Sequence, residues 1–125
     1  MHDLLRLSAS EQAGLIRGRK VSSCELVQAH LDQIAKVNPE INAAVEVFAD
    51  NAMAEARTAD RTLARNGGTI GPLHGVPFSI KDSIEVAGTV CTAGTLGRAG
   101  APKSTEDATL AVSYTHLTLP TILRV

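Results

Sequence analysis

A lysine followed directly by an aspartate is the residue pair in this chain that is best suited to chemistry. Lys81 and Asp82 close the stretch "HGVPFSIKDS", in which a Gly-Val-Pro turn leads into a short apolar strand. A lysine amine that is shielded from water favours its uncharged form, which can take a proton from a serine hydroxyl as the base of Ser-Lys hydrolases does. The local pattern by itself favours a solvated charge at a strand end. Sequence patterning alone does not decide between these two interpretations of Lys81.

The other residue types that could do chemistry form no recognisable site. The chain has four histidines, at positions 2, 30, 74 and 116. They lack the paired spacing of zinc-binding helices, and no cysteine lies near them. We interpret His30 as a hydrogen-bonded packing residue of a helix and His74 as bonded to local backbone. Gly94, Gly97 and Gly100 have the spacing of neither a dinucleotide nor a phosphate loop, so no metal or cofactor site is predicted.

Composition narrows the class of protein. The 125 residues are 44% hydrophobic with a formal net charge of −1, which indicates at most one domain and no basic footprint for nucleic acid or anionic lipid. Cys24 and Cys91 fit no metal or redox spacing, and we expect both to be reduced core residues. No apolar run approaches the ~20 residues of a membrane span, and the first residues do not resemble a signal peptide. The expected location is therefore cytoplasmic.

Helical signals dominate the first part of the chain. A first helix can be capped by Ser8 or Ser10. A second begins with a capping box, Ser22 followed three residues later by Glu25, and apolar residues then recur at helical spacing. We expect this helix to end before Pro39, because the residue before a proline is disfavoured in the α region.

The rest of the chain is predicted to mix strand, helix and loop. Residues 43–48 form a short segment with β-branched residues, which suits a strand. Asp50 is placed to cap the helix that follows. The charged side chains of that helix are predicted to form a solvated face. Residues 69–110 are rich in Gly and Pro and indicate loops and short strands, with Ser104 or Thr105 able to open one more helix.

Three motifs in the same order together resemble the amidase signature family. The run "GPLHGVPFSIKDSIEVAGTVCTAGT" resembles the segment in which that family carries its Lys-Asp pair. Upstream, "KVSSCELVQAHLDQIAKVNPEINAAVEV" resembles the family's N-terminal helix and the strand entry after it. Downstream, "STEDATLAV" resembles the Asp-Ala-Thr segment at the head of the next helix. The resemblance covers about residues 8–111 and is specific, because separate motifs occur with the right gaps.

This resemblance implies an α/β fold, with a mixed sheet flanked by helices, and a serine amidohydrolase with a Ser-cisSer-Lys triad. By motif match Lys81 corresponds to the base, and Asp82 to an acid that we interpret as structural support. The two serines belong to a later Gly-Ser-rich segment that this sequence does not contain, so no nucleophile is assigned and the chain alone is expected to be inactive. The mechanism needs only side chains and water, which implies no cofactor.

The end of the sequence departs from the family pattern. We therefore divide the chain into an N-terminal portion of an amidase domain, residues 1–111, and a non-native tail, residues 112–125. Threonines, β-branched residues and Pro120 in that tail argue against a continuing helix. Its "VSYTHLTLPT" resembles one translated reading frame of a widely used transposase-type sequencing adapter, which would make residues 122–124 a variable index.

Three functions are compatible with these observations. The first is an amidase that hydrolyses a carboxamide through an acyl-serine intermediate, with a small-molecule amide as its only partner and no nucleic acid or membrane. The second is the amidase-type subunit of a glutamyl- or aspartyl-tRNA amidotransferase, which releases ammonia from glutamine for partner subunits. "SIEVAGTVCTAGT" resembles the general amidases more closely than the amidotransferase type. The third is a truncated interaction module, for which the tail lacks the expected amphipathic pattern.

Overall fold

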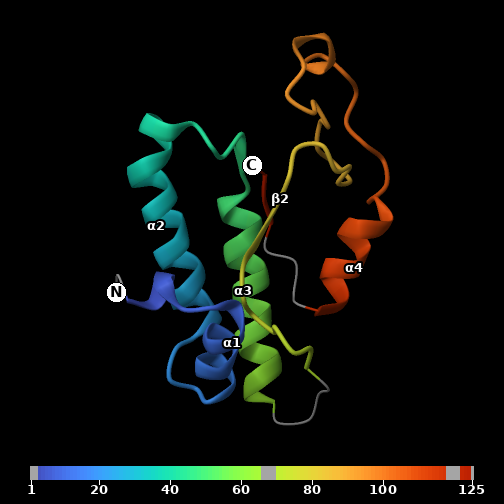
Figure 1. Cartoon of the computed structure of the whole chain (residues 1–125). Coiled ribbons are helices and arrows are strands. Elements are labelled where there is room, and N and C mark those ends of the chain that lie inside the picture. Colours follow the sequence, from blue (N-terminus) through green and yellow to red (C-terminus); the bar gives the residue numbers. More distant parts are fainter. Residues whose placement is uncertain (1–2, 66–69, 118–121, 125) are drawn as a thin grey trace.

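Three helices pack together beside a small sheet, and a fourth helix lies across from them (Figure 1). The computed structural model describes residues 3–65, 70–117 and 122–124. The α-helices are α1 (Ala9–Arg17), α2 (Ser23–Ile41), α3 (Ala49–Ala64) and α4 (Thr109–Leu117). Two single 3₁₀ turns, η1 (Leu4–Arg6) and η2 (Leu96–Arg98), complete the helical elements of the described residues. The long segment between β2 and α4 projects beyond the helices at the top of the view.

The sheet is mixed, as the family resemblance implied. Its strands are β1 (Glu46–Val47), β2 (Phe78–Ile80) and β3 (Ile122–Arg124), in the spatial order β1-β3-β2. β3 runs antiparallel to β1 and parallel to β2, so that Leu123 is opposite Val47 on one side and Ser79 on the other. The strand expected over residues 43–48 is confirmed only at Glu46 and Val47, the two residues that pair.

The beginnings of the first two helices agree with the sequence. Ser8 and Glu11 form a capping box at α1, and Ser22 and Glu25 form the second at α2. In each box the serine hydroxyl accepts a hydrogen bond from the glutamate N–H, and the glutamate carboxylate accepts one from the serine N–H. Two backbone donors that a free helix end leaves unpaired are thereby satisfied at each helix.

The predicted end of α2 is wrong by one helical turn. Pro39 lies inside the last turn, and the helix ends at Ile41, followed by the cap residue Asn42, whose φ of 48° is left-handed. Near a C-terminus the missing N–H of a proline removes a single backbone hydrogen bond. The Asn38 side chain fixes the chain just beyond the helix, because it accepts from the Ala44 N–H at 2.7 Å and donates to the Ala44 carbonyl at 3.0 Å.

The charged face of α3 is only partly solvated. Asp60 lies at the N-terminus of α2, where its two carboxylate oxygens accept from the N–H groups of Ser23 at 2.7 Å and Cys24 at 3.1 Å. The predicted cap Asp50 instead lies in the first turn of α3, behind an N-cap residue, Phe48, that makes no side-chain cap. The arginines of the helix, at positions 57, 61 and 65, are exposed as expected.

Two hydrophobic clusters hold the three N-terminal helices together. One joins α2 to α3 through Val27, Ala52 and Ala56, whose small alanines let the two helix backbones approach closely. The other combines residues of α1, α2 and the segment before β2: Ala13, Ile16, Leu26 and Val76. A third cluster, of Ile80, Val86 and Ala111, packs β2 against α4. None of the described helices is both long and apolar enough to cross a membrane.

The fourth helix corrects two expectations. It begins at Thr109 rather than near Ser104 or Thr105, with the Ala108 carbonyl accepting from Val112 N–H at 3.1 Å. It also continues through Leu117, so the expectation that residues after 111 leave the helix is wrong. β-Branched residues lower helix propensity by only a few tenths of a kcal/mol, which local context readily overrides. Pro120 lies outside the described residues, and the division at residue 111 stays a prediction.

Two buried side-chain atoms have no hydrogen-bond partner among the described residues, His30 Nε2 and Glu55 Oε2. His30 lies half-buried in α2. Its Nε2 lacks the partner that the interpretation of His30 as a hydrogen-bonded packing residue would lead one to expect. Burial lowers the pKa of His30 and raises the pKa of Glu55 to about 7. For Glu55 the ionised form is thus less favourable in the folded chain than in the unfolded one.

Replacement of Asp60 by alanine should lower the free energy of unfolding by about 1–2 kcal/mol, because two N–H groups at the start of α2 lose their acceptors. Asp60→Asn keeps one acceptor oxygen and should lose less. Urea unfolding followed by circular dichroism measures both. Equal stability of wild type and Asp60→Ala would contradict the capping role.

The stability that Glu55 contributes should depend on pH. Its folded pKa is raised, so this contribution is present below the unfolded value of 4.5 and is lost as pH rises through about 7. Glu55→Gln should therefore match wild type near pH 4.5 and exceed it at pH 8 by about 1 kcal/mol, a figure reduced for the half-exposed side chain. The exposed Glu40→Gln is the matched control for the loss of a surface carboxylate. Parallel pH profiles for wild type and Glu55→Gln would contradict the assignment.

Candidate functional site

The turn that precedes β2 is seated where the first three helices meet. His74 is buried, and its Nε2 donates to the carbonyl of Ala59 in α3 at 3.0 Å, so its partner is a distant helix and not the local backbone expected from the sequence. Gly75 accepts from Ser23 Oγ at 2.6 Å, at the start of α2. Val76 then enters the cluster shared with Ile16 and Leu26. Three consecutive residues thereby contact three helices.

A side chain at position 75 would not fit. Gly75 has a φ of +78°, which favours glycine, and a Cβ would lie 3.0 Å from Ser23 Oγ and 3.3 Å from Ile16 Cδ1. The close approach fixes where the chain leaves the helices and enters β2. The direction of β2 in turn fixes where Lys81 lies.

Lys81 and its neighbours alternate between exterior and interior. Ile80 at the end of β2 is 2% exposed, Lys81 is exposed, and Asp82 is 7% exposed. A turn begins at once, because the Lys81 carbonyl accepts from Ile84 N–H at 3.0 Å. Ser79 and Ser83, on either side in the sequence, are also exposed. The structure thus places the Lys81 amine at the surface of this chain, on the outer side of a strand end.

Asp82 organises the loop that follows. Its carboxylate accepts from the Thr92 hydroxyl and from the Thr92 N–H at 3.4 Å, and its carbonyl accepts from Ala93 N–H and Cys91 Sγ at 3.2 Å each. Ala93 and Gly94 both have positive φ, 50° and 71°, an unusual conformation for alanine. The Asp82 contacts hold that turn in place, which agrees with the structural role expected for this residue.

Thr92 is the residue of this network that the sequence did not single out. Its hydroxyl donates to Asp82 and also accepts from Gly94 N–H at 3.3 Å. A threonine near two turn residues ten positions after an aspartate is too common a pattern to predict such a bond. Only the fold brings the two side chains together.

The cysteines are unpaired, as predicted. Burial, with a contribution from the neighbouring carboxylate of Asp60, raises the pKa of the Cys24 thiol to about 11. At neutral pH this thiol keeps its proton and is a poor nucleophile. Within the described ranges, His, Cys, Asp and Glu side chains form no group of three that could hold a metal ion.

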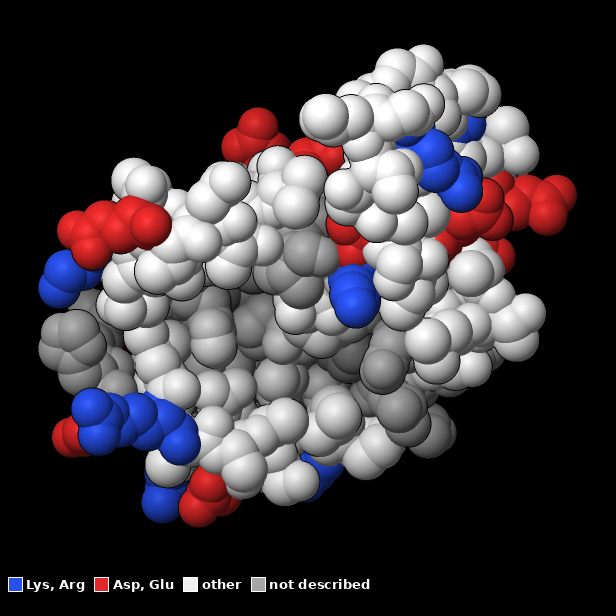
Figure 2. Space-filling view, turned by 45° about the horizontal axis from the view of Figure 1, so that its top comes forward, with Lys and Arg blue, Asp and Glu red and all other residues white. Residues whose placement is uncertain are grey.

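The charge on the visible surface is dispersed. Figure 2 shows a face that is mostly uncharged, with Lys and Arg in separate small groups and no continuous basic patch. Nucleic-acid binding needs such a patch, so this face lacks the electrostatic footprint of a nucleic-acid interface.

Thr92→Val keeps the shape of the side chain and removes its hydroxyl. We expect a loss of about 1.5–3 kcal/mol in the free energy of unfolding, because a hydrogen bond to a buried carboxylate disappears. The control Thr95→Val removes an exposed hydroxyl that donates to the Thr92 carbonyl, and should cost less than about 0.5 kcal/mol. Denaturant titration of the two variants compares them, and an equal loss in both would rule out a special role for the Asp82–Thr92 bond.

Comparison with known proteins places these residues among relatives. A family model described as amidase matches residues 25–117. A glutamyl-tRNA(Gln) amidotransferase subunit of Acidothermus cellulolyticus is 45% identical over 94 residues, 75% of this chain and 18% of that protein. The indoleacetamide hydrolase of Bradyrhizobium diazoefficiens is 42% identical over 81 residues, 65% of this chain and 15% of that protein. The chain thus spans about a fifth of the length of the curated relatives that it matches.

Solved structures agree in fold. A peptide amidase in complex with the competitive inhibitor chymostatin superposes with a TM-score of 0.79 at 30% identity, covering 94% of this chain and 24% of that one. The expected α/β fold, a mixed sheet flanked by helices, is confirmed by this similarity.

Proposed function

The chain belongs to the amidase signature family, and on that premise we propose that it is part of an enzyme that hydrolyses a carboxamide C–N bond through an acyl-serine intermediate. The observation that carries this proposal is the Lys81–Asp82 pair at the end of β2, inside the family match and on a rigid support. The amide substrate is a small molecule, and no cofactor takes part.

In this proposal Lys81 is the base of a Ser-cisSer-Lys triad. It accepts a proton relayed by the bridging serine from the attacking serine, whose oxygen adds to the carbonyl carbon. The proton then passes to the amide nitrogen as the C–N bond breaks and the amine leaves, and water hydrolyses the acyl-serine ester. Exclusion of water favours the uncharged amine of a lysine, the form that accepts a proton. Because Lys81 is exposed in this chain, the proposal requires a covering segment that supplies both serines. We infer that the 125 residues alone do not turn over an amide.

A second candidate is favoured by the relatives. The amidotransferase subunit from A. cellulolyticus is 45% identical, so the same chemistry can serve to release ammonia from glutamine for partner subunits. The indoleacetamide hydrolase at 42% supports the general amidase that the segment after Lys81 favoured. Glutaminase activity that depends on added partner subunits would identify the amidotransferase, and hydrolysis of simple amides without them would identify the amidase.

The mechanism predicts the effect of Lys81→Ala in the full-length enzyme of the source gene. Loss of the base should lower kcat by about 10⁴-fold or more and abolish labelling by a fluorophosphonate, with little change in thermal unfolding. The exposed Lys103→Ala is the matched control and should keep both the turnover and the fluorophosphonate labelling of the wild type. Retained turnover in Lys81→Ala would remove Lys81 from the mechanism.

The inferred non-native tail has a direct test in the source DNA. If residues 112–125 derive from an adapter, the genomic sequence beyond codon 111 will encode a different segment. Genomic sequence that encodes "VSYTHLTLPT" would overturn this inference.

A further inference from the structure

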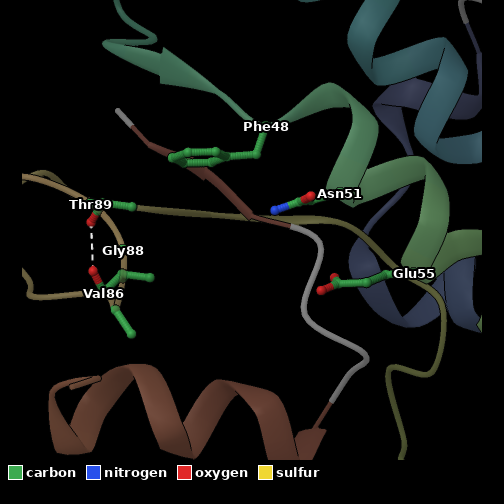
Figure 3. Close-up of a pocket in the computed structure, with 7 residues that line it drawn as sticks. Phe48, Asn51, Glu55, Val86, Gly88 and Thr89 are labelled. Carbon is green, nitrogen blue, oxygen red and sulfur yellow. Dashed lines mark hydrogen bonds between the residues drawn. The ribbon is translucent and has the colours of Figure 1, made fainter. Parts of the chain in front are cut away.

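A small pocket lies between α3 and the turn that follows the Lys81–Asp82 pair. It has a volume of about 170 Å³ and is lined by Phe48, Asn51 and Glu55 on one side and by residues 86–89 on the other. Asn51 and Glu55 are four residues apart, so they lie on the same face of α3. Figure 3 shows both side chains projecting from the helix toward Val86 and Thr89, with the Phe48 ring at one end of the space.

The hydrogen-bond donors of residues 87–89, on the turn side of this pocket, are already used. The N–H of Ala87 donates to Asp107 Oδ1 at 2.8 Å, that of Gly88 to the Ser104 carbonyl at 2.8 Å, and that of Thr89 to the Val86 carbonyl at 3.1 Å. The Thr89 hydroxyl also donates to that carbonyl, at 2.7 Å. A ligand that must accept hydrogen bonds, such as a phosphate or carboxylate, therefore finds none of these donors free.

Acceptors remain on the helix side. Glu55 Oε2 is buried and has no hydrogen-bond partner among the described residues, and Glu55 carries the one ionisable side chain among the described residues that line the pocket. The Asn51 carboxamide can turn its oxygen inward. The Phe48 ring adds an aromatic surface of the kind that attracts cations. Asp107, whose carboxylate accepts from the Ala87 N–H, is a second acidic side chain bonded to the turn.

We propose that this pocket binds an organic cation, an ammonium or guanidinium group on a short alkyl chain, with Glu55 as its carboxylate partner. Charge-assisted hydrogen bonds from nitrogen to a carboxylate are the strong ones in proteins. The volume lies below the ~300–1,000 Å³ typical of drug-sized ligands, so it admits one small cation or one basic side chain. Such a cation satisfies the buried Glu55 oxygen, which has no partner among the residues that the structure describes. The proposal does not depend on the amidase function.

Nuclear magnetic resonance titration of the 125-residue chain with methylguanidinium and with n-propylammonium tests the proposal, with sodium chloride as the salt control. We expect saturable shifts at the amides of Asn51, Ala87 and Gly88 for at least one organic cation and none for sodium. Since the Glu55 carboxyl has a pKa of about 7, affinity should fall about tenfold between pH 8 and pH 6. Acetyl-arginine-methylamide and acetyl-lysine-methylamide distinguish a free small cation from the basic side chain of a protein. Tighter binding of these two compounds than of the free cations indicates that a basic side chain is the natural occupant.

Two variants make the result specific. Glu55→Gln should weaken binding at pH 8 at least about tenfold and remove its pH dependence, whereas the exposed Glu40→Gln should change neither. If Glu55→Gln fails to fold, the chemical shift of the Glu55 carboxyl carbon in the wild type is followed against pH instead. A cation bound to the carboxylate must lower the apparent pKa of Glu55. No saturable shift up to about 50 mM, or unchanged binding in Glu55→Gln, would overturn the proposal.

Discussion

The contact on which the rest of this structure depends is the close approach of Gly75 to the start of α2. The 2.6 Å hydrogen bond from Ser23 Oγ to the Gly75 carbonyl and the absence of a Cβ bring two backbone segments together that are 52 residues apart. Asp60 caps the same end of α2 from α3, and His74 bonds back to α3. One small junction therefore fixes three helices and the point at which β2 leaves them.

The consequence for chemistry is that the chain positions a lysine without enclosing it. Ile80 and Asp82 are anchored in the interior on either side of Lys81, so the backbone at this residue is held even though its side chain faces solvent. Asp82 extends that rigidity into the next loop through Thr92 and the turn at Ala93. An enzyme that needs a base in a fixed place gains from a support that leaves one side open for the other reacting groups.

Local signals in the sequence predicted local structure well. The cap at Ser8, one of the two serines proposed for it, the capping box at Ser22 and the short strand before Lys81 depend on residues within a few positions of one another, and all are confirmed. Contacts across long separations were not predictable: Asp60 looked like a surface charge because its partners lie 37 and 36 residues away. The predicted end of α2 was wrong because a proline disfavours the α region at the preceding residue without forbidding it. The predicted bounds of α4 were wrong because helix propensity is weak. The bridging and attacking serines of the triad are not in this chain. Their roles could therefore be inferred only from the resemblance to the family.

In this 125-residue chain, including the residues 112–125 that we infer to be non-native, the place of β3 in the sheet determines the order in which the sheet can form during synthesis on the ribosome. Among the described residues, β1 and β2 each pair with β3 and not with each other, and β3 follows β2 by more than 40 residues. At roughly 5–20 residues per second, the emerging chain carries two unpaired strands for a few seconds after β2 appears. The helical junction around Gly75 has all its residues by then. The three N-terminal helices can therefore pack together before β3 is synthesised and pairs with β1 and β2.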